Sequence, residues 1–425
     1  MNVWLLTTGE SLPTDGENVR MWRTGIIASL LVDRGHRVTW WTSSFYHALK
    51  RQRVRKDEVI VLSSRYRLIL LHAPAYSRNI SIARLINHCM IGRKFVKFAK
   101  REKAPDIILC SFPTIELSLA ATRYGVKQRV PVVLDVRDLW PDIFLDFTPQ
   151  KLRWLVKFLL FPYFWAARSA FRNATAVLGI TDPIMRWGLE KASRPQSPFD
   201  RDFPFGYPSK KVDATEVSRS VNFWAKHGID HQKKAFVCCF FGTLGRQLDL
   251  DTVIHAARRL LDQKSPFIFV LCGDGDNSEY YRNLAKGCDN IIFPGWVNQA
   301  DITVLMKRSS VGLTPYYSKM DFSMSIPNKS IEYLSAGLPV ISSLKGVLQE
   351  LLSVHQCGIT YENGNSDMLI SILTNLYDNP GELKVMSEHA RRLYEQRFAA
   401  DEVYNKMVDH LSLIRDNFGY RPNIS

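Results

Sequence analysis

Two charged side chains, Lys329 and Glu332, lie about one turn apart near the start of a predicted helix. Proline is favoured at the first position of a helix and glycine just past its end, so the sequence predicts a helix from about Pro327 to Gly337. An apolar strand over Val340–Ser342 follows. The free N–H groups at such a helix start form a site for anions.

Lys329 is an unusual choice for this position, because a cation in the first turn opposes the helix dipole by roughly 0.3–1 kcal/mol. A phosphate beside the lysine would remove that cost, and Glu332 is suited to accept hydrogen bonds from paired sugar hydroxyls. A phosphate together with a diol indicates a nucleotide. On local chemistry alone, an exposed helix start with two solvated charges fits the same residues.

Three further turns of the second half follow apolar strands, where the ligands of a parallel sheet bind. Small residues in such turns let backbone N–H groups approach a diphosphate, and an arginine supplies a bidentate charge. Each turn also fits a plain connection, and Trp296 fits plain packing equally well. The candidate residues are Gly242, Gly245 and Arg246 after one strand, Gly273 after the next, and Trp296 and Val297 after a third.

The elements that position these residues alternate between apolar strands and amphipathic helices. Near-continuous apolar strands are typical of parallel sheets covered on both faces, so we expect an α/β fold with two Rossmann-like, doubly wound domains that face a cleft. A Pro- and aromatic-rich stretch over Arg194–Lys211 is the predicted linker. The last helix, Asp401–Arg415, is expected to fold back over the first domain. The predicted domains are 1–208 with 400–425, and 209–399.

Seven predicted strands lie in the first half and five in the second. The first-half strands are Val3–Thr8, Val38–Thr42, Val59–Leu62, Leu68–His72, Asp106–Ser111, Val132–Val136 and Ala176–Ile180. Those of the second half are Ala235–Phe241, Phe267–Cys272, Asn290–Phe293, Val311–Thr314 and Val340–Ser342. Helices are expected over Val19–Arg34, Ile82–Glu102 and Ile115–Tyr124, and throughout Asp367–Arg415.

The net charge of +15 over 425 residues is carried by the first half of the chain. Residues 1–212 hold 34 Lys and Arg against 17 Asp and Glu, whereas residues 213–425 hold 22 against 24. Such asymmetry predicts a polyanion or an anionic membrane on that side, and no nucleic-acid-binding signature accompanies it. The aromatic and basic stretch Trp154–Trp165 favours an interfacial membrane contact, with a buried helix as the alternative.

Neither a leader peptide nor a membrane-spanning segment is evident, and the seven cysteines lack metal-binding or disulfide spacing. We therefore expect a cytoplasmic protein. No Asp-x-Asp signature stands out at a strand end, because Asp249 and Asp251 begin a predicted helix and are interpreted as capping residues. We expect no metal and no cofactor.

Taken together, these turns and the Lys329/Glu332 helix resemble the donor domain of the family-four, GT-B-fold glycosyltransferases. The resemblance covers residues 236–398, most specifically 326–342. It implies that Asn328, Lys329 and Glu332 bind the nucleotide diphosphate and ribose, that Arg246 contacts the diphosphate, and that the segment around Trp296 and Val297 lies against the base.

The first half supports the resemblance. Residues 9–16, which end in Gly16, look like the family's opening loop after its first strand, with Arg20 on the same acceptor side. Residues 133–142 are similar to the D-x-R-D-x-W-P segment of bacterial members that build O-antigen and capsule chains. Arg137 and Asp138 lie in that segment, and the resemblance makes Asp138 the candidate for contacting the acceptor or handling its proton. Without it, Asp138 fits an N-cap of the next helix.

One position departs from the family pattern. Many relatives carry a glutamate eight residues before the one that matches Glu332, and here that position is Met324. Members are retaining enzymes thought to rely on leaving-group assistance instead of a fixed nucleophile, so the change need not abolish activity. Backbone groups or Asp321 are the expected replacement for the sugar contacts.

These observations predict a cytoplasmic, retaining glycosyltransferase that binds peripherally to the inner face of the membrane. Its donor is expected to be a nucleotide-diphosphate sugar. The nucleotide is expected to be UDP, and the sugar a hexosyl or N-acetylhexosaminyl group. Its acceptor is expected to be a lipid-linked saccharide or polysaccharide. Arg246 and Lys329 would stabilise the departing diphosphate in place of a metal. Two alternatives are a GT-B-fold nucleotide-sugar epimerase and a nucleotide-binding scaffold with weak or no catalysis.

Overall fold

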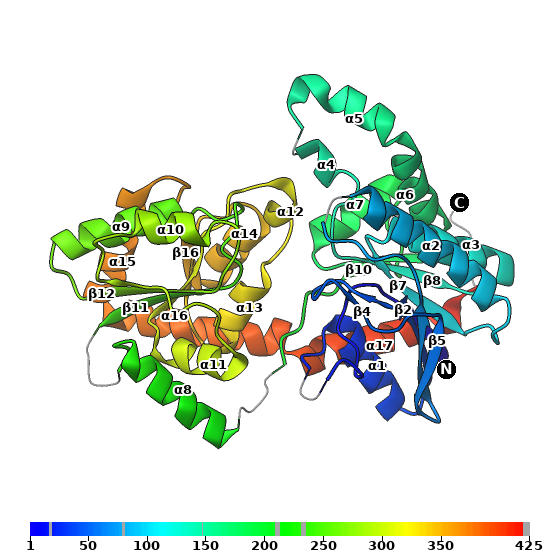
Figure 1. The fold of residues 1–425 in the computed structure, drawn as a ribbon, viewed down its shortest axis with the longest axis horizontal. Coiled ribbons are helices and arrows are strands. Elements are labelled where there is room, and N and C mark those ends of the chain that lie inside the picture. Colours follow the sequence, from blue (N-terminus) through cyan, green and yellow to red (C-terminus); the bar gives the residue numbers. More distant parts are fainter. Residues whose placement is uncertain (17–18, 79–80, 147, 209–212, 231–234, 420–425) are drawn as a thin grey trace. The chain divides into compact units, whose positions relative to one another are not determined.

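The computed structural model describes residues 1–16, 19–78, 81–146, 148–208, 213–230 and 235–419. The chain divides into two compact units, one formed by Met1–Phe205 with Val403–Ser425 and the other by Gly206–Glu402. Each unit contains a sheet with helices on both faces, and the strands are parallel except for one edge strand of the first unit (Figure 1). The predicted residues 209–211 of the linker and 420–425 of the returning segment lie outside the described part.

The sheet of the first unit has eight strands, and seven of them are parallel. Their spatial order is β10 (Arg201–Asp202), β9 (Ala176–Gly179), β8 (Val132–Val136), β7 (Ile107–Phe112), β1 (Asn2–Leu6), β2 (Arg37–Ser43), β6 (Tyr66–Leu71) and β5 (Glu58–Ser63). The prediction of Val59–Leu62 as a covered parallel strand was wrong. Strand β5 runs antiparallel to β6, and its side chains are largely exposed because it forms the edge of the sheet.

Right-handed crossovers place the helices of the first unit on two faces. Helix α1 (Arg23–Asp33), between β1 and β2, lies on one face. The connections that lead from β6 toward β10 run in the opposite direction and cover the other face. They contain α2 (Ile82–Ala99), α3 (Ile115–Gln128), α6 (Phe161–Asn173) and α7 (Asp182–Ala192).

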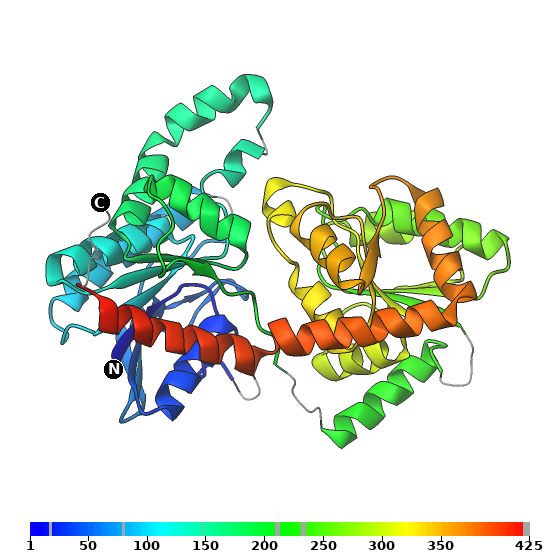
Figure 2. The same cartoon turned by 180° about the vertical axis from the view of Figure 1, so that it is seen from behind.

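Two short excursions interrupt this pattern. Strands β3 (Phe45–Tyr46) and β4 (Arg51–Gln52) form a small antiparallel pair after β2. Between β8 and α6 lie α4 (Ile143–Asp146), a 3₁₀ turn over Gln150–Leu152 and α5 (Arg153–Leu159). In both views α5 projects beyond the helices that cover the sheet (Figures 1 and 2).

Part of the predicted linker over Arg194–Lys211 is an ordered edge of the first unit. Asp200 is buried, and its carboxylate accepts hydrogen bonds from the Val177 N–H at 2.7 Å and from both terminal nitrogens of Arg194. This anchoring places β10 beside β9. Proline content misled the prediction, since the contact that orders the segment lies more than twenty residues away in sequence.

The sheet of the second unit has six parallel strands. Their order is β13 (Ile291–Ile292), β12 (Phe267–Cys272), β11 (Phe236–Phe241), β14 (Val311–Thr314), β15 (Val340–Ser342) and β16 (Gly358–Thr360). Five of these were predicted. Strand β16 was missed because it is a three-residue edge strand, only partly buried, without an apolar run.

The same handedness argument distributes the helices of this unit. Helices α9 (Leu250–Asp262) and α10 (Ser278–Leu284) lie on one face of the sheet. Helices α11 (Gln299–Arg308), α13 (Asn328–Ser335) and α14 (Val347–His355) lie on the other (Figure 1). The remaining helices are α8 (Ala214–Lys226), α12 (Met320–Ser323), α15 (Ser366–Asp378) and α16 (Pro380–Leu393).

A π-helical turn over Tyr394–Phe398 precedes the last helix, α17 (Ala400–Asn417). From Val403 onward α17 belongs to the first unit. Arg34 of α1 pairs with Asp409 and Asn405, and His410 bonds to the Phe199 carbonyl at 2.9 Å. The predicted doubly wound α/β fold and the returning helix are therefore confirmed. Within the described ranges, no helix combines the length and apolarity needed to cross a bilayer.

Candidate functional site

The second sheet has a topological switch point between β11 and β14. The connection after β11 leads toward β13, and the connection after β14 leads toward β16, so the two loops part at this position. In open parallel sheets, ligands bind in the crevice that such diverging loops leave. Backbone hydrogen bonds hold the two loops together farther along, with the Asp249 N–H bonded to the Pro315 carbonyl at 2.8 Å and the Tyr317 N–H to the Gln247 carbonyl at 3.1 Å.

Glycines at the ends of β11 and β12 bring their turns into direct contact. The Gly242 N–H bonds to the Cys272 carbonyl at 3.1 Å, and the Gly273 N–H bonds to the Gly295 carbonyl at 2.7 Å. A Cβ on Gly273 would lie 1.9 Å from the Gly242 carbonyl oxygen, so no other residue fits there. Gly242, with φ of +146°, also leaves room for another group. The sequence predicted the two turns but not that they touch.

Lys329 occupies the space beside Gly242. A Cβ on Gly242 would lie 2.9 Å from the Lys329 Nζ. The ammonium donates a hydrogen bond to the Tyr316 hydroxyl and lies 4.9 Å from the centre of the Phe240 ring and 4.8 Å from that of Tyr316. Helix α13 begins one residue later than predicted, with Pro327 at the N-cap, so Lys329 is its second residue. Cation–π contacts hold the charge next to the open N–H groups of the helix.

Buried contacts fix α13 against the sheet. The Tyr333 hydroxyl donates to the carbonyls of Cys239 and Leu313 at 3.3 and 3.2 Å, and its ring packs over Gly312, where a Cβ would lie 2.4 Å from a ring atom. The hydroxyls of Ser330 and Thr314 are 3.1 Å apart. Because α13 rests so closely on β11 and β14, its first turn is held at the carboxyl edge of the sheet.

The other predicted donor-side residues differ in their exposure. Glu332 is buried, with 5% of its surface accessible, and Asn328 is exposed at the first position of α13. Arg246 is exposed and Gly245 is buried in the turn after β11. Trp296 is 78% exposed, so the packing interpretation for it is wrong, whereas its neighbour Val297 is buried.

Three residues that support the candidate site, Tyr316, Asn363 and Asp249, were not predicted or were assigned another role from the sequence. Tyr316 holds the Lys329 ammonium, and the Asn363 side chain donates to the Tyr316 carbonyl at 3.2 Å and to Asp249 at 3.1 Å. Asp249 precedes α9 as expected, yet its carboxylate accepts from the Thr252 hydroxyl and the Gly364 N–H, with no helix N–H as donor. It therefore links the loops after β11, β14 and β16. Only Tyr316, two residues after a predicted strand, was a usable signal in the sequence.

Asp321 and Met324, the positions tied to the family's missing glutamate, lie in and just after α12. Both side chains are partly exposed. The turn after β15 approaches this segment closely, since a Cβ on Gly346 would lie 2.2 Å from the Ser323 carbonyl oxygen. The segment is thus supported by the second sheet.

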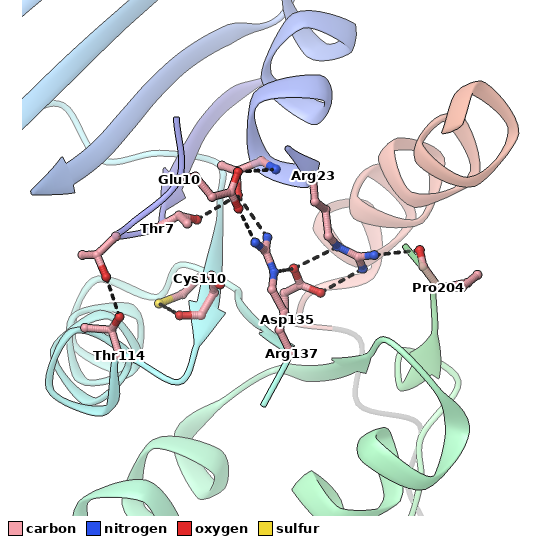
Figure 3. A network of polar contacts seen from close by, with 11 residues as sticks. Thr7, Glu10, Arg23, Cys110, Thr114, Asp135, Arg137 and Pro204 are labelled. Atoms are coloured by element: carbon pink, nitrogen blue, oxygen red, sulfur yellow. Dashed lines mark hydrogen bonds and ion pairs between the residues drawn. The ribbon is translucent and has the colours of Figure 1, made fainter. Parts of the chain in front are cut away.

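On the first unit, the predicted acceptor-side residue Arg137 belongs to a polar network at the ends of β1 and β8 (Figure 3). Asp135 and Arg23 form a bidentate pair at 2.9 and 3.0 Å, and neither side chain is exposed to solvent. Arg137 donates to Asp135 at 2.8 Å, to Glu10 and to the Thr24 hydroxyl at 3.0 Å. Its guanidinium is therefore occupied within the fold.

Burial alone would raise the pKa of Asp135, but the charges of Arg23 and Arg137 outweigh it and hold that pKa below its usual value. Arg23 also donates to the carbonyls of Phe203 and Pro204, both at 2.9 Å. The network therefore joins β8, the loop after β1, the start of α1 and the segment that leaves the first unit.

The remaining acceptor-side residues of the prediction are Asp138, Gly16 and Arg20. Asp138 is partly exposed, and its carboxylate accepts a hydrogen bond from the Leu139 N–H at 2.8 Å. It does not cap the next helix, because α4 starts only at Ile143. Gly16 and Arg20 flank residues that lie outside the described part, and the Arg20 guanidinium lies 4.7 Å from the centre of the Trp22 ring.

Each half of the chain matches a glycosyltransferase domain. Residues 22–196 match the model for the glycosyl transferase 4-like domain. Residues 224–393 match the model for glycosyl transferases group 1. The two matches fall in the first and second units respectively.

Curated relatives are distant and are matched over part of their length. The amylovoran biosynthesis glycosyltransferase AmsK of Erwinia amylovora is 23% identical over 210 residues, which cover 48% of this chain and 52% of the relative. The alpha-D-kanosaminyltransferase of Streptomyces kanamyceticus is 22% identical over 241 residues, or 55% and 59%. The chain thus spans about half the length of the curated relatives it matches.

Solved structures resemble the whole chain. Anabaena Alr3699/HepE in complex with UDP superimposes with a TM-score of 0.65 at 16% identity, covering 97% of this chain and 100% of that one. Sucrose-phosphate synthase from Thermosynechococcus elongatus gives 0.69 at 16% identity, covering 99% and 100%. At these identities the likeness shows the fold, which is the two-domain GT-B architecture.

The contact between the two glycine turns generates a stability prediction. Gly273→Ala places a methyl group against a backbone carbonyl, so we expect unfolding of the second unit to become easier by at least about 2 kcal/mol beyond a control. The control is Gly287→Ala, which has a positive φ of +80° but nothing within 4 Å of the new Cβ. Hydrogen exchange of β11 and β12 peptides in rising denaturant measures both variants, and equal losses would contradict the clash.

The buried pair predicts a second effect. Asp135→Asn leaves Arg23 buried without its counter-charge, and we expect a loss of about 3–5 kcal/mol in the first unit, measured by hydrogen exchange of α1 and β8 peptides. Asp409→Asn, which breaks the exposed pair with Arg34, should cost about 0–1 kcal/mol.

The pKa of Asp135 is lowered in the folded state, so its stabilisation is complete above the unfolded value near 4 and is lost as the pH falls below it. The difference between wild type and Asp135→Asn should therefore shrink in acid. A difference that grows below about pH 4 would show that the carboxylate charge is not the stabilising feature.

Proposed function

We propose that this chain, both halves of which match glycosyltransferase domains, transfers a sugar from a nucleotide-diphosphate sugar to a lipid-linked saccharide or polysaccharide acceptor. The observation that carries the proposal is the Lys329 ammonium, held beside Gly242 at the start of α13 and at the switch point of the second sheet. A cation next to open helix N–H groups is a site for a diphosphate.

UDP is the nucleotide we propose. The HepE structures that share this fold were solved with UDP and with UDP-glucose. Glu332, one turn after Lys329 and buried, is assigned to the ribose hydroxyls, and Val297 with the exposed Trp296 to the base. Arg246, also exposed, is free to close on the diphosphate from the turn after β11. The sugar transferred is proposed to be a hexosyl or N-acetylhexosaminyl group.

The proposed chemistry retains the configuration of the donor sugar. The glycosidic bond to the diphosphate breaks as the acceptor hydroxyl attacks the same face, and the proton of that hydroxyl passes to the departing diphosphate. Lys329 and Arg246 stabilise the growing negative charge on the diphosphate without a metal. Asp138, two residues after β8, is assigned to accept the proton of the acceptor hydroxyl and to pass it on to the departing diphosphate. Arg137, fixed by Asp135 and Glu10, positions the loop that carries Asp138.

Cell-surface glycan synthesis of the O-antigen or capsule type is the proposed setting. AmsK, one relative in sequence, is named for the biosynthesis of amylovoran. The basic first half and the exposed aromatic side chains of α5 support peripheral attachment to the inner face of the cytoplasmic membrane.

The donor site is tested by UDP binding. Lys329→Met and Glu332→Gln each remove one charge with little change in shape, and we expect each to raise the Kd for UDP about tenfold or more in isothermal titration calorimetry. Lys286→Met, an exposed lysine before β13 at the amino edge of the sheet, should bind like wild type. If all three variants bind UDP equally well, the site is misplaced.

The role of Asp138 predicts a different pattern. Asp138→Asn should slow transfer from a radiolabelled UDP-sugar to a membrane lipid extract about 100-fold or more, while the Kd for UDP stays unchanged. Asp182→Asn, a half-exposed carboxylate in the first turn of α7, is the matched control. Normal transfer by Asp138→Asn would remove this carboxylate from the mechanism.

A further inference from the structure

An apolar groove of about 530 Å³ lies between α2 and the α4–α6 segment of the first unit. Its volume falls within the range of small-ligand pockets, about 300–1,000 Å³. Hydrocarbon side chains form most of its wall, with Ile82 and Leu85 on one side and Phe144, Val156, Leu159 and Leu160 on the other. Nothing assigned to the donor site lies in this part of the fold.

The groove continues into an exposed apolar surface, which we call the α5 patch: Trp154, Phe158, Leu159 and Phe161. These side chains are between 64% and 74% exposed, and α5 buries none of its residues. The buried-helix alternative for this stretch is therefore wrong. On the facing helix, Ile82 is 77% exposed. Contiguous apolar surface of this kind marks a site of interaction with a membrane or another apolar partner.

The charge around the groove favours an anionic lipid over a protein helix as that partner. No Asp or Glu occurs in residues 59–101 or 147–181, the two segments that supply most of the wall. The second segment carries Lys151, Arg153, Lys157, Arg168 and Arg172. Lys and Arg side chains close to an anionic leaflet strengthen binding to it.

The inner end of the groove is polar. The Arg84 guanidinium lies 4.6 Å from the centre of the Trp140 ring and donates from Nε to the His88 ring at 3.5 Å. Burial lowers the pKa of His88 to about 3, so its imidazole is neutral at pH 7 and Arg84 supplies the cation. The carboxyl of Glu116 lies behind the groove wall, 3.8 Å from His88 Nδ1, and accepts from the Tyr163 hydroxyl at 2.7 Å; burial raises its pKa. Trp140 lies only two residues after Asp138 in the loop that follows β8.

We infer that this groove holds the hydrocarbon chain of the lipid that carries the acceptor, with the lipid phosphate at Arg84. The inference rests on the proposed function and names the part of the acceptor that the first unit recognises. A chain seated along Leu85 and Val156 leads its phosphate to the Arg84–Trp140 end, and the sugar beyond the phosphate then lies toward Asp138. The α5 patch dips into the bilayer and lets the chain enter without crossing water.

Farnesyl phosphate, a short prenyl chain with one phosphate, is the probe for this site. We expect it to bind the full-length chain in isothermal titration calorimetry below its micelle concentration, and we expect inorganic phosphate and farnesol each to bind at least about tenfold more weakly. Val156→Trp fills the groove and should weaken farnesyl phosphate about tenfold or more, with Leu85→Trp, from the opposite wall, as a second variant.

A matched pair of surface substitutions separates the groove from the membrane contact. Trp154→Ser with Phe158→Ser changes side chains of the α5 patch that do not line the groove. This variant should bind farnesyl phosphate like wild type but lose most of its sedimentation with phosphatidylglycerol vesicles, and wild-type sedimentation should fall at high salt. Little of the wild type or of the variant should sediment with phosphatidylcholine vesicles.

UDP binding serves as the internal control, because the donor site lies in the other unit. Unchanged UDP affinity in the groove variants shows that their second unit is folded, and hydrogen exchange of α1 and β8 peptides like that of wild type shows the same of the first unit. Unchanged farnesyl phosphate affinity in both tryptophan variants would overturn the inference, as would equal binding of a short-chain phosphatidylglycerol. If wild type binds farnesyl phosphate but not UDP, the proposed donor function fails while the groove stands. If wild type binds UDP but not farnesyl phosphate, the inference about the groove fails while the proposed donor function stands.

Discussion

An ammonium group at the amino end of a helix is the constraint on which the second unit depends. Lys329 opposes the dipole of α13 and is kept there by two aromatic rings and the Tyr316 hydroxyl, none of which neutralises its charge. The surrounding architecture serves this placement. Tyr333 fixes the helix against the strands, and Gly242 supplies the space into which the lysine extends. The diphosphate proposed to bind here would offset this energetic cost, because the site presents a positive charge before the ligand arrives.

Local sequence patterns predicted much of the fold but few of the contacts between loops. Buried strands such as β8, β12 and β14 agree with their predicted bounds because each is a short apolar run between turn residues. Edge elements did not follow this rule. Strand β5 is exposed and antiparallel, and β10 depends on the bond between Asp200 and the Val177 N–H, 23 residues away in sequence. Edge strands are set by tertiary contacts that periodicity does not record.

The candidate site shows the same division. Spacing located Lys329 and Glu332, and glycine turns located Gly242 and Gly273. The sequence could not show that Asn363 and Asp249 meet beneath Tyr316, because these residues come from three separate connections. In the first unit, the D-x-R-D-x-W-P segment supplied two candidates. Arg137 is held by hydrogen bonds within the fold, whereas Asp138 is partly exposed. The motif alone did not show which of these two residues is held by the fold.

The first unit is discontinuous in sequence, and this sets the order in which it can be completed during synthesis. All the strands of its sheet have been synthesised once the chain reaches Asp202. Helix α17, which covers the same face of this sheet as α1, leaves the ribosome only after the whole second unit. At about 5–20 residues per second, the gap lasts on the order of ten seconds or more. During that interval the apolar surface that later receives Val408, Leu411 and Ile414 is uncovered. The nascent chain is therefore most exposed to aggregation and to chaperones just before its last helix arrives.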